Sequence, residues 1–367
     1  MPTLKIGNLE ICPPIIQGGM GVRISKANLA SAVANEGCVG VIASAGLGEY
    51  ESTNVAGFCT INAKALKQEI KTARKKSSGI LGVNIMVALS DYENLVQAAV
   101  DEKIDIIISG AGLPLDLPKY TKGTDIKLIP IVSSARTFDI ICKKWKRHFD
   151  RLPDAVIVEG VKAGGHLGYL YEDIISDKTQ TLEEIVTEVV ANANSYTPKI
   201  PVIAAGGIYT GQDIARFIEM GAAGVQMATR FVCTDECDAH ENFKMAYINC
   251  RQEDIEIIQS PVGMPGKVIN NRFVEEIKKG KKIPFKCNYH CLRTCDPNIA
   301  PYCIAKVLSN TVNGKMDEAF AFEGSNAWKC DKIVSVKSLI KELIEELKDS
   351  LSSRKPSLET LCHQKTP

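Results

Sequence analysis

The sequence predicts a (β/α)₈ barrel that carries a C-terminal extension. Eight short runs rich in valine, isoleucine, alanine and glycine alternate with longer amphipathic segments up to about residue 232, and these runs end in glycine or polar residues. This alternation is typical of a parallel sheet with crossover helices. An open doubly wound sheet uses the same units but usually has about five or six strands, so eight units favour the closed barrel.

The predicted strands are apolar at nearly every position, as strands buried on both faces should be. They span residues 14–20, 39–45, 80–86, 105–110, 127–133, 155–160, 201–206 and 224–230. Helical patterns lie between them. One covers residues 25–36, with Ser25 as the expected N-cap, and another covers 210–220, where Ile214, Phe217 and Ile218 share one face.

The barrel is expected to occupy residues 1–270, and a cysteine-rich extension residues 271–350. In the extension, residues 302–308 should begin a helix. A final amphipathic helix should cover the barrel or a second subunit, because apolar residues recur at helical spacing beside charged ones. These apolar residues are Val336, Leu339, Ile340, Leu343, Ile344 and Leu347. Residues 351–367 are expected to form a flexible tail.

Charge and composition exclude some classes of function. Lysine and arginine number 44 against 43 aspartate and glutamate, so nothing indicates a nucleic-acid or anionic-membrane partner. Residues 1–10 do not resemble a secretory leader, and no run of about 18 apolar residues follows. We therefore expect a soluble, cytoplasmic protein whose 13 cysteines are reduced thiols, metal ligands or redox groups.

Two neighbouring loops at the end of the barrel favour a phosphorylated ligand. Strand seven is followed by Gly206 and Gly207, and strand eight by Ala228 and Thr229. Glycines let the backbone approach an anion closely, and barrels often bind phosphate between these two loops. The alternative is that the glycines only turn the chain tightly. No G-x-G-x-x-G motif follows a strand and no Walker motif occurs, so a separate nucleotide domain is not expected.

His166 is the best catalytic candidate because it lies in a glycine loop after the sixth strand, at the barrel edge where active sites form. An imidazole there suits proton transfer near neutral pH. The other histidines, at positions 148, 240, 290 and 363, are expected to be solvated or structurally paired.

Several motifs together resemble the nitronate monooxygenase family over about residues 10–270. Flavin-type enoyl-acyl-carrier-protein reductases share them closely. Each motif alone is weak, but their occurrence in this order is specific. They are QGGMG at 17–21, GVNIM at 82–86, EGVKAGGHLG at 159–168, IAAGGI at 203–208, GA at 221–222 and GVQMATRF at 224–231.

This resemblance implies non-covalent FMN at the barrel mouth, with His166 matching the catalytic histidine of the family. In the family, the residues beside the isoalloxazine ring are those that match Gly19, Met20 and Asn84. The residues beside the phosphate and the ribityl chain are those that match Gly206, Gly207, Gln226, Ala228 and Thr229, and Met227 lies in the same motif. The family has a further polar flavin contact after its histidine, for which residues 179–181 are candidates that we do not assign.

The resemblance leaves the reaction open. The preferred reading is oxidation of an alkyl nitronate with O2 to a carbonyl compound and nitrite. The alternative is NAD(P)H-dependent reduction of an enoyl thioester, and a different class of explanation is a non-catalytic barrel that binds a phosphorylated ligand. Residues 233–240 and 260–266 could line the cleft and change the substrate. The sequence leaves a homodimer open.

Four cysteines of the extension lie within 17 residues, at Cys287, Cys291, Cys295 and Cys303. Four thiolates can hold zinc or an iron–sulfur cluster, but the C-x₂-C pairs typical of such sites are missing. Buried reduced thiols are the preferred interpretation, because free cysteine packs like a small hydrophobe. No metal is therefore expected.

Overall fold

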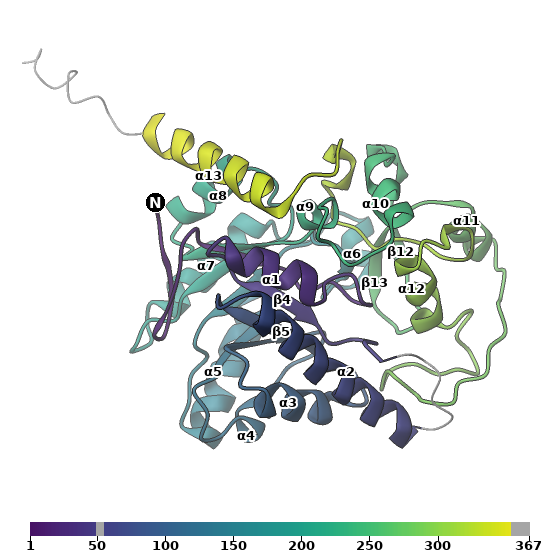
Figure 1. The fold of residues 1–367 in the computed structure, drawn as a ribbon, viewed down its shortest axis with the longest axis horizontal. Coiled ribbons are helices and arrows are strands. Elements are labelled where there is room, and N and C mark those ends of the chain that lie inside the picture. The colour runs from purple at the N-terminus through teal and green to yellow at the C-terminus, as the bar shows by residue number, and fades with distance from the viewer. Residues whose placement is uncertain (49–54, 354–367) are drawn as a thin grey trace, which may run out of the picture.

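The computed structural model describes residues 1–48 and 55–353, and its central element is an eight-stranded parallel barrel (Figure 1). The strand order is β3-β11-β10-β8-β7-β6-β5-β4, and a parallel bridge between Ile16 and Val39 joins the first strand to the last. All eight predicted strands are present, and the open doubly wound sheet is excluded. Their bounds are β3 (Ile15–Gln17), β4 (Gly40–Ala43), β5 (Leu81–Met86), β6 (Ile106–Gly110), β7 (Lys127–Val132), β8 (Val156–Glu159), β10 (Val202–Ala205) and β11 (Gly224–Met227).

Helices follow the strands and cover the outside of the barrel. They are α1 (Ala27–Asn35), α2 (Val55–Lys76), α3 (Tyr92–Asp101), α4 (Leu117–Tyr120), α5 (Ala135–Phe149), α6 (Tyr171–Ile175), α7 (Leu182–Ala193), α8 (Gly211–Glu219) and α9 (Thr229–Val232). The predicted helix at 210–220 is α8. Thr210 and Asp213 form a reciprocal capping box at its start, which satisfies backbone N–H groups that have no partner within the helix.

The expected N-cap at Ser25 is wrong. Helix α1 begins at Ala27 after an extended Lys26, and the Ser25 hydroxyl instead accepts a hydrogen bond from the Met20 N–H at 2.8 Å. Carboxylates from distant segments cap the helix. Asp238 accepts from the N–H groups of Lys26 at 2.8 Å and Leu29 at 3.2 Å, and Glu69 accepts from that of Ala27 at 2.9 Å.

The amino-terminal end of the barrel is closed by a hairpin of β1 (Leu4–Ile6) and β2 (Leu9–Ile11). Leu4, Ile6 and Ile11 are fully buried and pack with strand residues such as Ile106 and Ile157. The interior is therefore a packed core at this end, and the opposite end is left for ligands.

The elements between α9 and the final helix gather on one side of the barrel, at the right of Figure 1. They include α10 (Glu241–Ile248), β12 (Ile255–Gln259), β13 (Pro265–Ile269), α11 (Arg272–Lys278) and α12 (Ile304–Val312), with short 3₁₀ turns at Gln252–Asp254, Met316–Glu318 and Ala327–Lys329. β13 pairs with β12 and also with β9 (Gly165–His166), so a small antiparallel sheet ties this half of the chain to the histidine loop.

The predicted final helix is α13 (Val336–Ser353), and it packs along α8 and also contacts α1 (Figure 1). Leu339, Leu343 and Leu347 are fully buried there. The Gly211 N–H donates to the Glu346 carboxylate at 2.6 Å. The helix thus covers the barrel. The predicted flexible tail at 351–367 lies almost wholly outside the described residues. No helix in the described parts of the chain is long and apolar enough to cross a membrane.

Candidate active site

One cavity of about 290 Å³ opens at the carboxyl ends of the barrel strands. Every residue that the sequence assigned to catalysis or to the cofactor lines this cavity, although these assignments came from segments spread over more than half of the chain. They are Gly19, Met20, Asn84, His166, Gly206, Gly207, Gln226, Met227, Ala228 and Thr229. The fold therefore brings the predicted site residues together, and their individual roles remain predictions.

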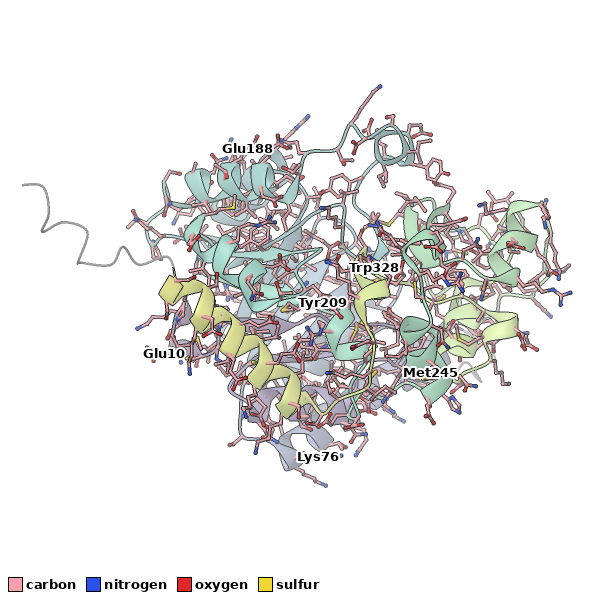
Figure 2. All side chains as sticks on the ribbon, turned by 90° about the horizontal axis from the view of Figure 1, so that it is seen from above. Glu10, Lys76, Glu188, Tyr209, Met245 and Trp328 are labelled. Atoms are coloured by element: carbon pink, nitrogen blue, oxygen red, sulfur yellow. The ribbon has the colours of Figure 1, made fainter. Side chains whose placement is uncertain are left out.

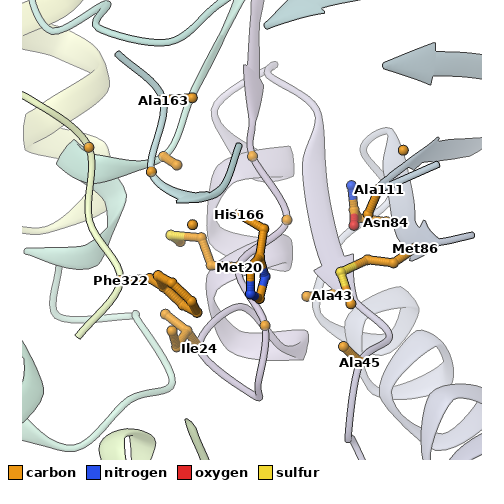
Figure 3. Close-up of a pocket in the computed structure, with 18 of the residues that line it drawn as sticks. Met20, Ile24, Ala43, Ala45, Asn84, Met86, Ala111, Ala163, His166 and Phe322 are labelled. Carbon is orange, nitrogen blue, oxygen red and sulfur yellow. The ribbon is translucent and has the colours of Figure 1, made fainter. Parts of the chain in front are cut away.

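His166 is held on strand β9 by its pairing with Gly266 of β13. Its Nε2 lies 2.8 Å from the Ser260 hydroxyl, and its ring packs on Phe322 with a centroid distance of 4.7 Å. Figure 3 shows the imidazole projecting between Met20 and Phe322 on one side and Asn84 and Met86 on the other. The ring thus points into the cavity from an apolar wall.

This enclosed position lowers the pKa of His166 to about 4, because burial penalises the charged imidazolium. The imidazole is therefore neutral near pH 7. A neutral ring can accept a proton or a hydrogen bond, which suits a general base. Ser260 was not assigned a role from the sequence. It belongs to the 260–266 segment that was expected to line the cleft; no residue of this segment lines the cavity, and Ser260 acts on it only through His166.

Gly19, which follows β3, lies against Asn84 in the second half of β5. A Cβ added to Gly19 would lie 2.4 Å from the Asn84 Cβ, so only glycine fits this position without movement. The Asn84 carbonyl accepts from the Ser44 N–H at 3.0 Å, which fixes the end of the strand. This corner presents backbone and an amide side chain to a flat ligand.

The two glycines after β10 form a close-fitting turn. Gly206 and Gly207 have φ of +98° and +82°, the left-handed region that favours glycine. A Cβ on Gly206 would lie 2.9 Å from the Gly160 carbonyl oxygen, and one on Gly207 would lie 2.9 Å from the Lys162 Cβ. Lys162 also lines the cavity, which adds to the predicted phosphate side a cation that the sequence analysis did not assign.

Gln226 supplies an independent sign of a ligand. Its Oε1 is buried at the end of β11 without a hydrogen-bond partner. A buried amide oxygen without a donor costs about 1–3 kcal/mol. A ligand with N–H or O–H groups would satisfy it. Together with the glycine turn, this oxygen fits a polar, phosphorylated cofactor such as FMN.

Residues 322–326 of the C-terminal extension, which we call the strap, lie against the turns that follow β8 and β10. The Asn326 amide donates to the Gly207 carbonyl at 2.7 Å, and the Ser325 N–H donates to the Lys162 carbonyl at 3.1 Å. A Cβ on Gly324 would lie 2.7 Å from the Thr229 hydroxyl oxygen. Sequence analysis missed the strap, since no pattern in the sequence links position 326 to position 207.

Lys267 ties the strap to the histidine loop, and Glu323 of the strap is buried near it. Lys267 of β13 donates to the Val161 carbonyl at 2.8 Å and to the Ser325 hydroxyl. Glu323 is 1% exposed, and both of its carboxylate oxygens lack hydrogen-bond partners. Burial raises the pKa of Glu323 to about 8 and lowers that of Lys267 to about 8.

The part of the cavity beyond the histidine is apolar. Phe58, Leu89 and Leu292 contribute to its wall, and α12 adds Ile304 and Leu308. These groups are suited to an apolar substrate. Glu159, at the end of β8, is an additional titratable group in the lining, and burial raises its pKa to about 7.

Cys291 also lines this wall, whereas Cys287, Cys295 and Cys303 do not. Within the described residues, no group of three or more histidine, cysteine, aspartate or glutamate side chains is arranged to hold a metal ion. Burial raises the pKa of Cys291, Cys295 and Cys303, as for thiols packed in an apolar region.

Two other segments that were considered for the site do not line the cavity. Residues 233–240 lie beside α10, and residues 179–181 precede α7, where Thr181 is an exposed N-cap. Neither contributes to the pocket that His166 shares with the glycine turns.

Comparison with known proteins gives one family match and several relatives. The family model described as nitronate monooxygenase matches residues 3–346. The chain is 27% identical to a probable nitronate monooxygenase of Staphylococcus aureus (strain MSSA476), over 74% of this chain and 79% of that protein. It is 28% identical to a (3aS,4S,5R,7aS)-5-hydroxy-7a-methyl-1-oxo-octahydro-1H-indene-4-carboxyl-CoA dehydrogenase of Rhodococcus jostii (strain RHA1), over 76% of this chain and 69% of the relative.

Two solved structures are similar over most of their length. FabK from Thermotoga maritima has a TM-score of 0.73 and 28% identity, covering 93% of this chain and 94% of that one. Nitroalkane oxidase from Streptomyces ansochromogenes has a TM-score of 0.73 and 21% identity, covering 93% and 97%. The second likeness concerns the fold alone.

Proposed function

The chain belongs to the nitronate monooxygenase family and is therefore an oxidoreductase, and on this premise we propose that it uses FMN and O2 to oxidise alkyl nitronates to a carbonyl compound and nitrite. The observation that carries the proposal is a neutral, enclosed His166 facing a cavity that has glycine turns on one side and an apolar wall on the other.

FMN would be held by residues already described. Gly206, Gly207 and Thr229 would surround the phosphate, with the unpartnered Gln226 oxygen accepting from a polar group of the cofactor. Gly19 and Asn84 would face the ring system. Bound FMN would accept electrons from the substrate carbon and pass them to oxygen, which is chemistry that side chains do not supply.

His166 would bind and orient the substrate. Its neutral imidazole packs on Phe322 and is hydrogen-bonded through Nε2 to the Ser260 hydroxyl. When Nε2–H donates to that hydroxyl, Nδ1 can take the proton from the α-carbon of a neutral nitroalkane; in the other tautomer, Nδ1–H can donate a hydrogen bond to a nitronate oxygen. The low dielectric of the surrounding apolar side chains strengthens either interaction. The same side chains would exclude water from the reacting carbon.

The substrate class follows from the lining beyond His166. Phe58, Leu89, Leu292, Ile304 and Leu308 offer contacts to an alkyl or cyclic group and no positive charge. A substrate with an apolar alkyl or cyclic group and a small nitronate group fits a cavity that has His166 on one side and apolar side chains on the other. Substrates with a longer alkyl chain should therefore bind more tightly, by about 0.8 kcal/mol for each buried methylene.

Reduction of an enoyl thioester by NAD(P)H is the second candidate function. Its support is the similarity to FabK, which at 28% identity is greater than that to nitroalkane oxidase. In that reaction a histidine that donates a proton to the substrate must itself be protonated or receive a proton from a neighbouring group. The low pKa of His166 favours the nitronate reaction instead.

The cofactor proposal is tested on the purified protein. We expect a yellow protein that releases FMN on denaturation. A colourless preparation that takes up no added FMN would overturn the proposal, and release of a different flavin would correct it.

The reaction is tested under anaerobic conditions, with an alkyl nitronate and NADH added to separate samples. We expect the nitronate to bleach the flavin absorbance rapidly and NADH to do so slowly. Rapid bleaching by NADH and none by the nitronate would establish the reductase alternative.

Replacement of the histidine, His166→Ala, tests its role. The variant should retain FMN while its rate with a neutral nitroalkane falls by about 10²–10⁴-fold, the usual worth of general acid–base catalysis. His148→Ala, at an exposed position on α5, is the matched control. Unchanged turnover in His166→Ala would remove this residue from the mechanism.

A further inference from the structure

Two cysteines far apart in the sequence meet outside the active-site cavity. Cys233 follows α9 and Cys330 follows the 3₁₀ turn at Ala327–Lys329. They are 4% and 5% exposed, and their thiols are hydrogen-bonded to each other. The Val334 N–H donates to the Cys233 carbonyl at 3.2 Å, and a bridge between Thr234 and Val334 keeps the two segments parallel.

Tyr209 and Arg230 make the surroundings of Cys330 favourable for a thiolate. The Tyr209 hydroxyl donates to the Cys330 sulfur at 3.5 Å, and the Arg230 guanidinium lies 4.6 Å from the centroid of the Tyr209 ring. Figure 2 places Tyr209 near Trp328, beside the segment that leads into α13. Hydrogen bonds from Cys233 and Tyr209 and the charge of Arg230 lower the pKa of Cys330.

The two thiols therefore differ in character. The pKa of Cys233 is raised, chiefly by its hydrogen bond with Cys330 and by burial. Among the described cysteines whose pKa departs from the ordinary value, Cys330 is the one in which it is lowered. The contact between the two sulfurs, with the Tyr209 hydroxyl and the Arg230 charge on the side of Cys330, suits attack of Cys330 on a peroxide followed by disulfide formation with Cys233.

A small cavity gives access to this pair. It has a volume of about 20 Å³ and is lined by Tyr209, Arg230, Cys233, Cys330 and the 331–334 segment. This volume is about enough for one water molecule, so both cysteines border a space that a small polar molecule can occupy.

We propose that Cys330 and Cys233 form a peroxide-sensitive dithiol, in which Cys330 is the reacting sulfur and Cys233 the resolving one. The Cys330 sulfur attacks one oxygen of hydrogen peroxide, so that an S–O bond forms, the O–O bond breaks and hydroxide leaves as water after taking a proton. The Cys233 sulfur then displaces the hydroxyl group from Cys330, so that the S–S bond forms, the S–O bond breaks and a second water leaves. Two thiols lose two electrons and one peroxide becomes two waters.

The consequence of the disulfide lies at the cofactor side of the active site. Cys330 follows the strap closely, since its N–H bonds to the Ala327 carbonyl and the Ala327 N–H bonds to the Gly324 carbonyl. Cys233 adjoins α9, whose first residue, Thr229, faces Gly324. The disulfide would join the strap covalently to the barrel. Reduction by a dithiol would release it.

The test treats the full-length protein with a small excess of hydrogen peroxide and then alkylates the remaining thiols under denaturing conditions. Peptide mapping by mass spectrometry should find the Cys233 and Cys330 peptides linked in most molecules and separate again after reduction with dithiothreitol. Alkylation of both cysteines after peroxide treatment, or disulfides confined to Cys287, Cys291, Cys295 and Cys303, would overturn the proposal.

Variants assign the two roles. Cys233→Ser should trap Cys330 as a sulfenic acid that dimedone labels, and Cys330→Ser should leave Cys233 unlabelled. Cys142→Ser, which removes a buried thiol whose pKa is raised to about 12, is the matched control and should form the linked peptide as the native chain does. Labelling of Cys142 rather than Cys330 would contradict the assignment. If Cys330→Ser fails to fold, labelling in Cys233→Ser still decides the matter.

Tyr209→Phe measures the contribution of the tyrosine hydroxyl. One hydrogen bond to the thiolate is worth about a tenfold difference in rate, so oxidation of Cys330 should slow by about that factor. An unchanged rate would show that the hydroxyl does not assist the reaction, contrary to the geometry proposed.

Discussion

The chemistry of individual residues in this site is decided by how completely the fold removes them from water. His166 remains neutral because Phe322 and the cavity wall surround it, while its hydrogen bond to Ser260 fixes the ring. Glu159 and Glu323 are held in less polar surroundings than a carboxylate prefers, and their pKa values rise accordingly. Such shifts concentrate at functional sites.

The pH profile of the reaction follows from the pKa of His166. Since this pKa is lowered from 6.5 to about 4, the imidazole is already unprotonated across about pH 5 to 8. We expect kcat/KM for a neutral nitroalkane to show no change near 6.5 that is due to His166. Glu159→Gln is the companion variant, because the Glu159 carboxyl has a pKa of about 7. If kcat/KM of this variant still changed with pH near 6.5, the result would contradict a neutral His166.

Stability should depend on pH through Glu323. Its pKa rises from 4.5 to about 8 on folding, so the folded chain keeps a proton that the unfolded chain has lost. The contribution of Glu323 to the free energy of unfolding should therefore fall as pH rises from 4.5 towards 8, with each pKa unit worth about 1.4 kcal/mol at most, whereas the lowered pKa of His166 acts in the opposite sense between about pH 4 and 6.5. Urea titrations at several pH values should show a flatter profile in Glu323→Gln than in the native chain. Glu188→Gln, at an exposed position, should leave the profile unchanged.

Some helices and strands could be predicted from the sequence and others could not. The difference depends on how far apart in the sequence the residues lie whose contacts fix each element. The barrel strands are buried on both faces, so each is a short apolar run, and α13 repeats its apolar residues with helical spacing. The start of α1 could not be predicted, because Asp238 and Glu69 cap it from far away in the chain. The strap was missed for the same reason.

Loss of the Asn326 amide should weaken cofactor binding. Asn326→Ala removes the hydrogen bond to the Gly207 carbonyl, which holds the strap against the glycine turn. Such a bond is worth about 0.5–1.5 kcal/mol, so the dissociation constant for FMN should rise by up to about tenfold. Flavin fluorescence titration measures the change. Asn298→Ala, at an exposed position, is the control, and equal affinities in the two variants would contradict a role for the strap.

At the scale of the whole molecule, the barrel and the later elements share one site. The small sheet of β9, β12 and β13 carries His166 on one strand and Lys267 on another, while the strap reaches back over the turns after β8 and β10. The family motifs end near residue 231, so the barrel half of the site could be predicted from them and the half supplied by the extension could not.

Cofactor binding should stabilise both halves together. A ligand that binds the folded state alone adds about 2.7 kcal/mol at 100 times its dissociation constant. We expect added FMN to raise the Tm of the flavin-free protein by several degrees in a single transition, measured by differential scanning calorimetry. Riboflavin at the same concentration is the control for the phosphate contacts. Equal shifts with the two compounds would show that the glycine turns do not bind phosphate.

The contact between Asn326 and Gly207 also sets an order of events during synthesis. A ribosome makes the chain from its N-terminus, and domains fold as they emerge. Gly19 emerges early, but the residue that secures the opposite side of the cofactor site follows roughly three hundred residues later. If the chain binds FMN as proposed, the nascent barrel should hold it less tightly until the extension is made, so an interrupted chain would contain a barrel without a closed site.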